Sequence, residues 1–240
     1  MKILALETSA KAVSVAVAEE GNILCSRFAN EGQTHSVTLM PMLDEMLASA
    51  GLTLKDIGAV AVSHGPGSFT GLRIGVSAAK GLAWALGLPC CGVSTLEAMA
   101  ENGRNFEGLI IGAMDARRSQ VYNAVFTCCD GQLTRLTPDR AISLPELWEE
   151  IKNREESKLV VGDGAELCYT YLSEHGISCQ MLPGDRGLQS AEGVAKVACR
   201  LAAAGKTLTP QELVPVYLRL SQAERERLAK GLPITVENKK

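Results

Sequence analysis

The sequence has 240 residues, of which 46% are hydrophobic and 21% are charged, with a formal net charge of −3. This composition predicts a globular chain with a sizeable core and excludes a disordered one. The weakly acidic balance argues against a freestanding nucleic-acid-binding protein, because such proteins normally carry a basic domain or stripe. We therefore expect any RNA contact to be shared with a partner.

The N-terminal residues MKILALETSA enter a strand-like run at once, without the basic and apolar segments of a secretion signal. No stretch is apolar enough over a sufficient length to cross a bilayer. The 8 cysteines include two adjacent pairs, at 90–91 and 128–129, but no C-x-x-C spacing. We expect a cytoplasmic protein with reduced thiols, no metal and no membrane association.

The first elements form a predicted β-meander followed by a helix. Apolar residues dominate residues 3–9, 13–18 and 22–29, and short turns separate these three strands. Residues 33–51 then carry apolar side chains at helical spacing, which predicts a helix with Thr34 or Ser36 as N-cap and Gly51 as C-cap.

A strand–helix–strand segment completes the first half. Residues 57–64 form a continuous apolar run that predicts a buried strand. A glycine-rich loop, HGPGSFTG, leads from this strand into a helix that runs to Leu86, and a short strand follows at 89–94. The order of elements is therefore three strands, a helix, a strand and a second helix, with one further short strand.

The second half repeats this order. Residues 5–17 align without gaps on residues 113–125, which places Glu7 on Asp115, and both segments begin a meander. Helix, strand and helix patterns follow at 143–154, 158–162 and 164–175. A duplicated βββαβα unit with an acid at each first hairpin resembles the actin, sugar kinase and Hsp70 superfamily. We place the division at the polar stretch ENGRNFEG, giving an N-terminal half of residues 1–104 and a C-terminal half of residues 105–240.

The two acids are candidate contacts for a nucleotide. An actin-like enzyme needs a glycine-containing turn beside each acid, so that backbone N–H groups bind phosphate while carboxylates organise Mg²⁺. Here the turns read ETSAK and DARRS, without glycine. Glu7 and Asp115 therefore either cap their own turns or contribute to a nucleotide or tRNA contact with Arg117 and Arg118.

The loop HGPGSFTG is a weak phosphate signal, because no G-K-[ST] closes it. The helix after it is more informative, because Gly71, Gly75 and Ala79 recur every four residues beside Leu72 and Val76. Each interior glycine costs a helix about 1 kcal/mol relative to alanine, so the repeated small residues indicate close approach by another element. Either the helix is enclosed in the core or it packs against another chain.

The helix predicted at 33–51 carries a second apolar stripe, formed by Leu39, Met42 and Met46. A helix that rests on one sheet needs one stripe, so the second is either a wide core face or an adaptable, methionine-rich interface. Two such helices side by side would form a four-helix contact with a similar pair on a partner.

These segments together resemble the TsaB (YeaZ) family of accessory subunits in bacterial tRNA threonylcarbamoyladenosine synthesis. The resemblance spans most of the chain and rests on the segments LETS at 6–9, HSVTLMPMLDEML at 35–47, SHGPGSFTGLRIG at 63–75, GVSTLEAMA at 92–100, DARRSQVY at 115–122 and PVYLR at 215–219. In the paralogous catalytic subunit TsaD, metal-binding histidines stand at the positions of Thr95 and Met99. The resemblance thus implies a chain without the catalytic metal site.

The resemblance also implies partners. It suggests a non-catalytic scaffold that dimerises with TsaD, recruits the ATPase TsaE and meets tRNA only within the complex, with Arg117 and Arg118 as candidate contacts. A homodimer of the isolated chain is an alternative. The expected partner interface consists of Leu39, Met42, Met46, Gly71, Leu72, Gly75, Val76 and Ala79.

Two rival functions remain open from the sequence. One is an actin-like ATP-dependent phosphotransferase that uses Glu7, Asp115 and the loop at 65–71. The other is a glycoprotease-like metallopeptidase, against which stands the lack of any H-E-x-x-H or paired metal-ligand spacing. We assign no catalytic residue and no cofactor.

Overall fold

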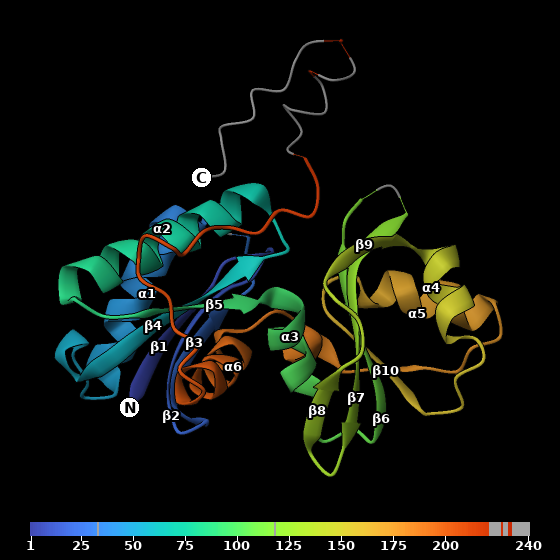
Figure 1. Ribbon diagram of the computed structural model, residues 1–240, viewed down its shortest axis with the longest axis horizontal. Helices are drawn as coiled ribbons and strands as arrows, with labels where there is room; N and C mark the ends of the chain where they lie inside the picture. Colours follow the sequence, from blue (N-terminus) through green and yellow to red (C-terminus); the bar gives the residue numbers. More distant parts are fainter. Residues whose placement is uncertain (33, 118, 221–226, 228–229, 232–240) are drawn as a thin grey trace.

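A computed structural model describes residues 1–32, 34–117, 119–220, 227, 230 and 231. The chain forms two α/β lobes that lie side by side (Figure 1), each built on its own sheet. The first sheet has the strand order β3-β2-β1-β4-β5. Its strands are β1 (Lys2–Glu7), β2 (Val13–Glu19), β3 (Asn22–Ala29), β4 (Ile57–Gly65) and β5 (Cys90–Ser94).

Two helices cover one face of this sheet. These are α1 (His35–Ser49) and α2 (Phe69–Leu86), which lie close together in Figure 1. Leu4 and Leu6 of β1 point toward them and share a buried cluster with Leu43 of α1 and Val76 of α2. Because side chains alternate along a strand, Ile3 and Ala5 face the opposite side of the sheet.

The second sheet has the order β11-β10-β6-β7-β8, with β9 paired to β7. Its helices α4 (Leu144–Ile151) and α5 (Ala165–Glu174) contribute to one core cluster with β6 and β10. Ser143 and Glu146 form a capping box that begins α4. The strands are β6 (Gly108–Asp115), β7 (Gln120–Cys129), β8 (Gln132–Arg135), β9 (Arg140–Ser143), β10 (Lys158–Val161) and β11 (Gln180–Met181).

The predicted duplication is confirmed. In each sheet the first strand lies between an antiparallel meander on one side and two parallel strands on the other. The matched strands β1 and β6 end at Glu7 and Asp115, as the alignment predicts. This is the predicted actin-like α/β fold.

The C-terminal residues do not stay with the second sheet. Helix α6 (Ala191–Ala203) packs on the free face of the first sheet, although its residues fall in the predicted half 105–240. The reason is complementary shape, because that sheet face carries small residues such as Ala5, Ala16 and Ala61, which let Ala195 and Ala198 approach closely. Short α3 (Thr95–Ala100) contacts α6 and packs on the second sheet, so these two helices form the junction between the halves.

After α6 the chain returns along the first half as an extended segment, residues 204–220, which we call the strap. The strap pairs with the start of β5, through Leu208 and Cys90. No described helix is long and apolar enough to cross a membrane. Within the described residues, three short 3₁₀ helices complete the fold, at Leu54–Asp56, Glu101–Gly103 and Gly184–Gly187.

Candidate functional site: the cleft between the halves

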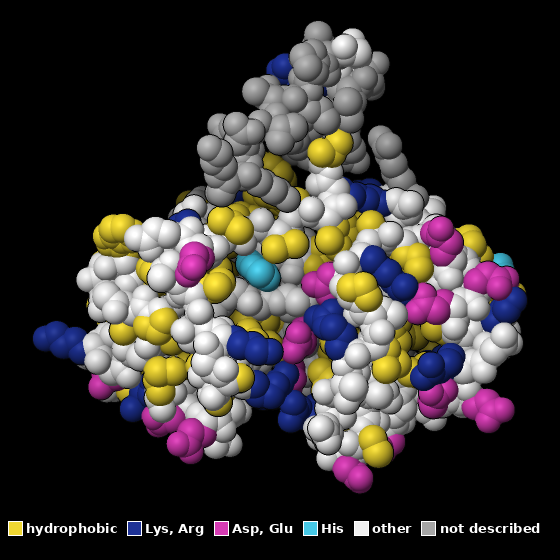
Figure 2. All heavy atoms as spheres, in the orientation of Figure 1, with side chains coloured by type: hydrophobic (Ala, Val, Ile, Leu, Met, Phe, Trp, Pro, Cys, Tyr) yellow, Lys and Arg dark blue, Asp and Glu magenta, His cyan; other side chains and the backbone are white. Residues whose placement is uncertain are grey.

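A cleft of about 580 Å³ lies between the two halves. Its walls come from the turns after β1 and β6, the loop before α2, Tyr122 of β7 and residues 216–220 of the strap. Figure 2 shows acidic and basic side chains close together along the junction of the lobes. Because β1 and β6 both end here, the cleft is the place where the predicted acids can be compared.

Glu7 is sealed behind the first wall of the cleft. Its side chain is 0% exposed, and its two carboxyl oxygens accept hydrogen bonds from the Ser63 hydroxyl and from the Ser9 N–H, the latter at 2.6 Å. Burial raises the pKa of Glu7 above its usual value, and the bonds from Ser63 and Ser9 oppose that rise only in part. In this arrangement the carboxyl group holds its own turn and is closed to ligands.

The glycine-rich loop packs against the same turn. The Ser68 N–H donates to the Ser9 carbonyl at 2.6 Å, and a Cβ added to Gly67 would lie 2.8 Å from the Ser9 Cβ. A Cβ added to Gly71 would collide with the Thr8 carbonyl, while the Thr8 hydroxyl donates to the Gly71 carbonyl at 2.8 Å. The glycines therefore let α2 approach the end of β1 within one chain. This corrects the expectation that they serve an intersubunit contact.

The second wall is open. Asp115 is exposed, and its Oδ1 accepts a hydrogen bond from the Arg117 N–H at 2.7 Å, which closes a short turn. Arg117 is exposed and adopts a left-handed backbone with φ of 65°. Arg118, the other predicted arginine, lies outside the described residues.

Asp163 is a lining residue that the sequence analysis missed. It follows β10, and its Oδ1 accepts from the Gln189 amide at 2.7 Å. Burial, the largest effect, raises the pKa of Asp163, and the nearby Asp115 carboxylate raises it further. The signal that could have found it is the stretch GDG directly after a buried strand, the counterpart of the loop after β4.

The two positions that the family resemblance compares with metal-binding histidines lie in an apolar interior here. Thr95 and Met99 of α3 are each 0% exposed, and Met99 packs with Leu96, Ile110 and Met114. Thr95 Oγ1 has no hydrogen-bond partner among the described residues. The described part of the chain contains no group of three or more His, Cys, Asp or Glu side chains that could hold a metal ion.

The predicted interface residues lie mainly in the chain's own core. Both helices rest on the first sheet through these side chains, and a Cβ on Gly75 would collide with the Thr8 hydroxyl. In the folded chain most of these side chains are therefore not available to a partner. Met42 is half-buried, and the buried members are Leu39, Met46, Gly71, Leu72, Gly75, Val76 and Ala79.

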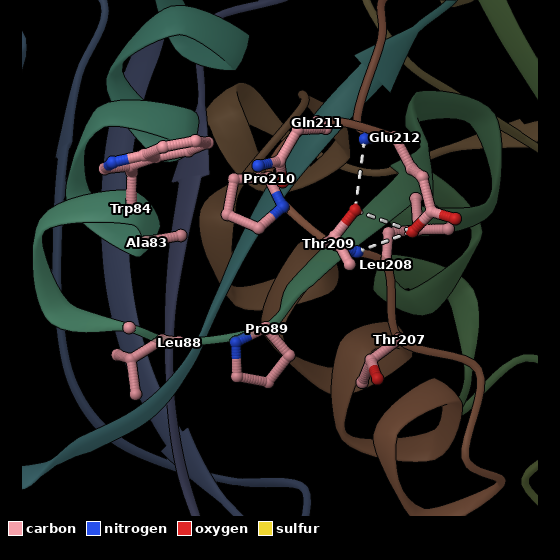
Figure 3. A pocket seen from close by; sticks show the side chains of 11 residues that line it. Ala83, Trp84, Leu88, Pro89, Thr207, Leu208, Thr209, Pro210, Gln211 and Glu212 are labelled. Carbon is pink, nitrogen blue, oxygen red and sulfur yellow. Dashed lines mark hydrogen bonds between the residues drawn. The ribbon is translucent and has the colours of Figure 1, made fainter.

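The outer faces of the same two helices expose other apolar side chains. Val37 and Met40 of α1 are 71% and 39% exposed, and Trp84 of α2 is 66% exposed. Beside Trp84, the end of α2 and strap residues 207–212 enclose a groove of about 470 Å³ (Figure 3). Isolated exposed apolar residues need no explanation, but several on neighbouring helices indicate a surface suited to a partner.

The strap joins the first half to the cleft. Lys80 of α2 donates to the Leu213 carbonyl at 3.1 Å, and the Val216 N–H donates to the His64 carbonyl at 2.7 Å. Near its end, Arg219 donates to the carbonyl of Ala116 in the second half. The strap was not predicted, because its contacts are mostly made by backbone groups and leave no periodic pattern in the sequence.

Comparison with known proteins decides the family. The family described as TsaD, tRNA N6-adenosine threonylcarbamoyltransferase, matches residues 23–221. Two curated relatives, each described as tRNA threonylcarbamoyladenosine biosynthesis protein TsaB, are 35% identical to the chain. The Bacillus subtilis relative aligns over 93% of this chain and 96% of its own length, and the Escherichia coli relative over 91% and 95%.

The chain belongs to the TsaB (YeaZ) family. A solved structure, YeaZ from Pseudomonas aeruginosa, superposes with a TM-score of 0.75 at 28% identity and covers 90% of this chain and 99% of that one. The predicted resemblance is therefore confirmed over nearly the whole chain.

Proposed function

We propose that the chain is a non-catalytic scaffold in the transfer of threonylcarbamoyl to the adenosine next to the anticodon of tRNAs that read ANN codons. In this proposal it dimerises with a TsaD-type catalytic subunit through the outer faces of α1 and α2. It also helps to recruit a TsaE-type ATPase, and in the transfer reaction it meets tRNA only within that complex. The membership in the TsaB family supports a role in this pathway.

The cleft supports the non-catalytic part of the proposal. The acid that would organise a metal and phosphate on the first wall, Glu7, is fully buried and engaged with Ser63 and Ser9. The turns beside Glu7 and Asp115 lack the glycine that a phosphate cradle requires. This sealed acid is the observation that carries the proposal, because it also disfavours the phosphotransferase alternative.

The outer faces of α1 and α2 support the scaffold part. Val37, Met40 and Trp84 place apolar surface on two adjacent helices. A similar pair of helices on a partner could complete a four-helix contact. When no partner is present, a second copy of the chain could cover the same face, which would give a homodimer.

The association test uses a double variant, Val37→Glu with Met40→Glu. Both side chains are exposed in the isolated chain, so the variant should keep its melting temperature and its circular dichroism spectrum. Two carboxylates buried at an apolar contact should weaken binding to TsaD by at least about tenfold, equivalent to 1.4 kcal/mol. Affinity is measured by titration calorimetry and activity by reconstitution with TsaD, TsaE, ATP, threonylcarbamoyl-adenylate and unmodified tRNA.

A matched control introduces two carboxylates at exposed apolar positions outside the proposed interface. Leu24→Glu with Leu136→Glu changes two apolar side chains that are 46% and 43% exposed but lie outside α1 and α2. This control should bind TsaD like the wild type. The interface proposal is wrong if both double variants bind equally well, and the scaffold proposal is wrong if the purified chain alone modifies tRNA.

A further inference from the structure

Three cationic side chains, those of Lys11, Arg117 and Arg219, line the mouth of the cleft, and a fourth, that of Arg73, contacts the lining residues Phe69 and Tyr217. Lys11 follows β1, Arg73 lies on α2, Arg117 follows β6 and Arg219 lies on the strap. None of them forms an ion pair within the part of the chain that the structure describes. Arginines elsewhere commonly do form one, as do Arg104, Arg135, Arg140, Arg154 and Arg200. Four positive charges thus gather here, beside the carboxylates of Asp115 and Asp163, although the whole chain is acidic.

Aromatic rings stand beside these cations. Phe69 and Tyr217 are stacked with their centroids 4.4 Å apart and their planes at 23°. The Arg73 guanidinium lies 4.1 Å from the Phe69 centroid and donates to the Tyr217 hydroxyl at 3.1 Å. Tyr122, on the opposite wall, lies 5.7 Å from the Arg219 guanidinium. Three of the chain's ten aromatic residues thus line this single cleft.

The second wall also presents carboxylates to the cleft. Asp115 and Asp163 line the second wall, and carboxylates there repel phosphate. Glu7 and its turn close the first wall to ligands. A phosphate group is therefore repelled by these two carboxylates and attracted by Lys11 and Arg117, while the aromatic rings offer apolar faces to a planar base.

We propose that the mouth of this cleft binds one unpaired nucleotide of an RNA strand, with the base against Tyr217, Phe69 or Tyr122 and the phosphate at Lys11 and Arg117. Stacking on aromatic rings combined with basic side chains along the backbone is how proteins bind single-stranded RNA. The choice of RNA over a free nucleotide rests on the proposed function in tRNA modification. The affinity of the chain alone is low, because its net charge of −3 opposes RNA at longer range.

The test is a charge reversal at the mouth, Lys11→Glu with Arg117→Glu, in the full chain. Binding of fluorescent unmodified tRNA is measured by anisotropy at about 50 mM and 200 mM salt, with protein up to about 100 µM, the weak end of non-specific binding. We expect at least tenfold weaker binding, and a salt dependence reduced by about 0.7 in log–log slope because the contact with one phosphate is lost. Co-elution with TsaD should not change.

Lys55→Glu with Lys206→Glu is the matched control. Both lysines are exposed. Lys55 lies just before β4, and Lys206 lies in the strap two residues before Leu208, which pairs with Cys90 at the start of β5, so both are at the end of the first sheet away from the cleft. The control should bind RNA nearly like the wild type. A second variant, Tyr217→Leu, removes an aromatic face while keeping an apolar side chain, and should weaken binding between about fivefold and a hundredfold with little change in salt dependence.

Three outcomes would overturn the proposal. These are no wild-type binding up to the highest concentration, equal weakening by the control, and unchanged binding by the charge-reversed variant. Competition with adenosine monophosphate distinguishes an RNA strand from a free nucleotide as the ligand. If adenosine monophosphate displaced tRNA at micromolar concentrations, the ligand of the cleft would be a free nucleotide and the RNA proposal would be wrong. Failure of the proposed function would appear separately, as a wild-type chain that does not associate with TsaD.

Discussion

The first turns of the two halves occupy matching places in the duplicated fold but differ in access to solvent. Glu7 ends β1 fully buried, beneath the glycine-rich loop and α2. Asp115 ends β6 exposed to the cleft and closes its own turn through the Arg117 N–H. One wall of the cleft is therefore a sealed part of the core, and the other still presents polar groups to a ligand.

The difference follows from where the glycines lie. In the first half Gly67, Gly71 and Gly75 bring a loop and a helix directly onto residues 8 and 9. In the second half a Cβ on Gly164 would lie 2.9 Å from the Asp115 backbone nitrogen, so close approach occurs there too, but it leaves the Asp115 side chain outside. Close packing against glycines therefore buries the carboxyl group of Glu7 in the first half, whereas in the second half it supports the turn and leaves the carboxylate of Asp115 exposed.

The largest expected effect is from Gly75→Leu, which tests whether α2 seals the first turn. The new side chain would collide with Thr8 and press on Val62, whose Cγ2 would be 3.2 Å from the added Cβ. Overpacking of this kind costs about 3 kcal/mol or more where backbone must move. We expect poor yield of folded protein and a melting temperature lowered by about 6 °C or more. A variant that folds normally would show that this face of α2 is free.

Replacing each acid with alanine should separate the two walls. Glu7→Ala leaves the Ser63 hydroxyl and Ser9 N–H buried without partners, at a cost of about 2 kcal/mol or more. Asp115→Ala removes one exposed turn bond and should cost less than about 1 kcal/mol. Denaturant titration measures both values. Equal losses would contradict the contrast between a sealed and an open wall.

Much of the fold is predictable from the sequence because its patterns are local. Apolar strands, the helical spacing of α1 and α2, and the alignment of Glu7 with Asp115 all appear in the chain itself and are found in the structure. Helix α6 could not be assigned to the first sheet, since its alanine-rich face fits either lobe and its place follows from the small residues across from it. The position of the strap could not be predicted either, because the strap is held mostly by backbone hydrogen bonds, which leave no pattern in the sequence.

The site was less predictable for a related reason. A stripe of small residues indicates close approach but does not identify the neighbour, and for Gly71 and Gly75 the neighbour is Thr8 of the same chain. Asp163 and Tyr217 reach the cleft from segments distant in sequence from both acids. Their shared position depends on how the two sheets meet, which no short stretch of sequence records.

The pH dependence of the melting temperature provides a further test of whether Glu7 is sealed in the core. Burial raises the pKa of Glu7 in the folded chain above its ordinary value of 4.5. Its contribution is fully present below pH 4.5 and is lost as pH rises through the folded pKa, because the buried group must then give up its proton. Glu7→Gln stays neutral, and its amide oxygen can accept from the Ser9 N–H while its amide nitrogen donates to the Ser63 hydroxyl. Its melting temperature relative to the wild type should therefore increase from pH 4 to pH 8.

The second half offers a counterpart for this measurement. Asp163 also has a raised pKa although the residue is exposed to the cleft, so Asp163→Asn should show the same direction of change with a smaller size. Thermal melts of both variants and the wild type at each pH provide the comparison. If the difference between Glu7→Gln and the wild type does not vary with pH, the group is not held protonated by burial and the first wall is less sealed than the contacts indicate.

The smallest expected effect is a gain, from Gly81→Ala on the outer face of α2. Gly81 lies in the same helix as Gly75, but a Cβ added there meets nothing within 4 Å and the backbone is helical. Alanine is a better helix former than glycine and loses less chain entropy on folding, so we expect about 0.4–1 kcal/mol of added stability. Denaturant titration beside Gly75→Ala completes the test, because the same substitution two turns away should destabilise the chain through its contact with Thr8.

Since Gly81 is exposed on the face proposed to meet TsaD, Gly81→Ala should also report on that contact. A stabilised monomer that binds TsaD more weakly would place Gly81 at the interface, whereas a destabilised monomer would contradict the assignment of this face as open.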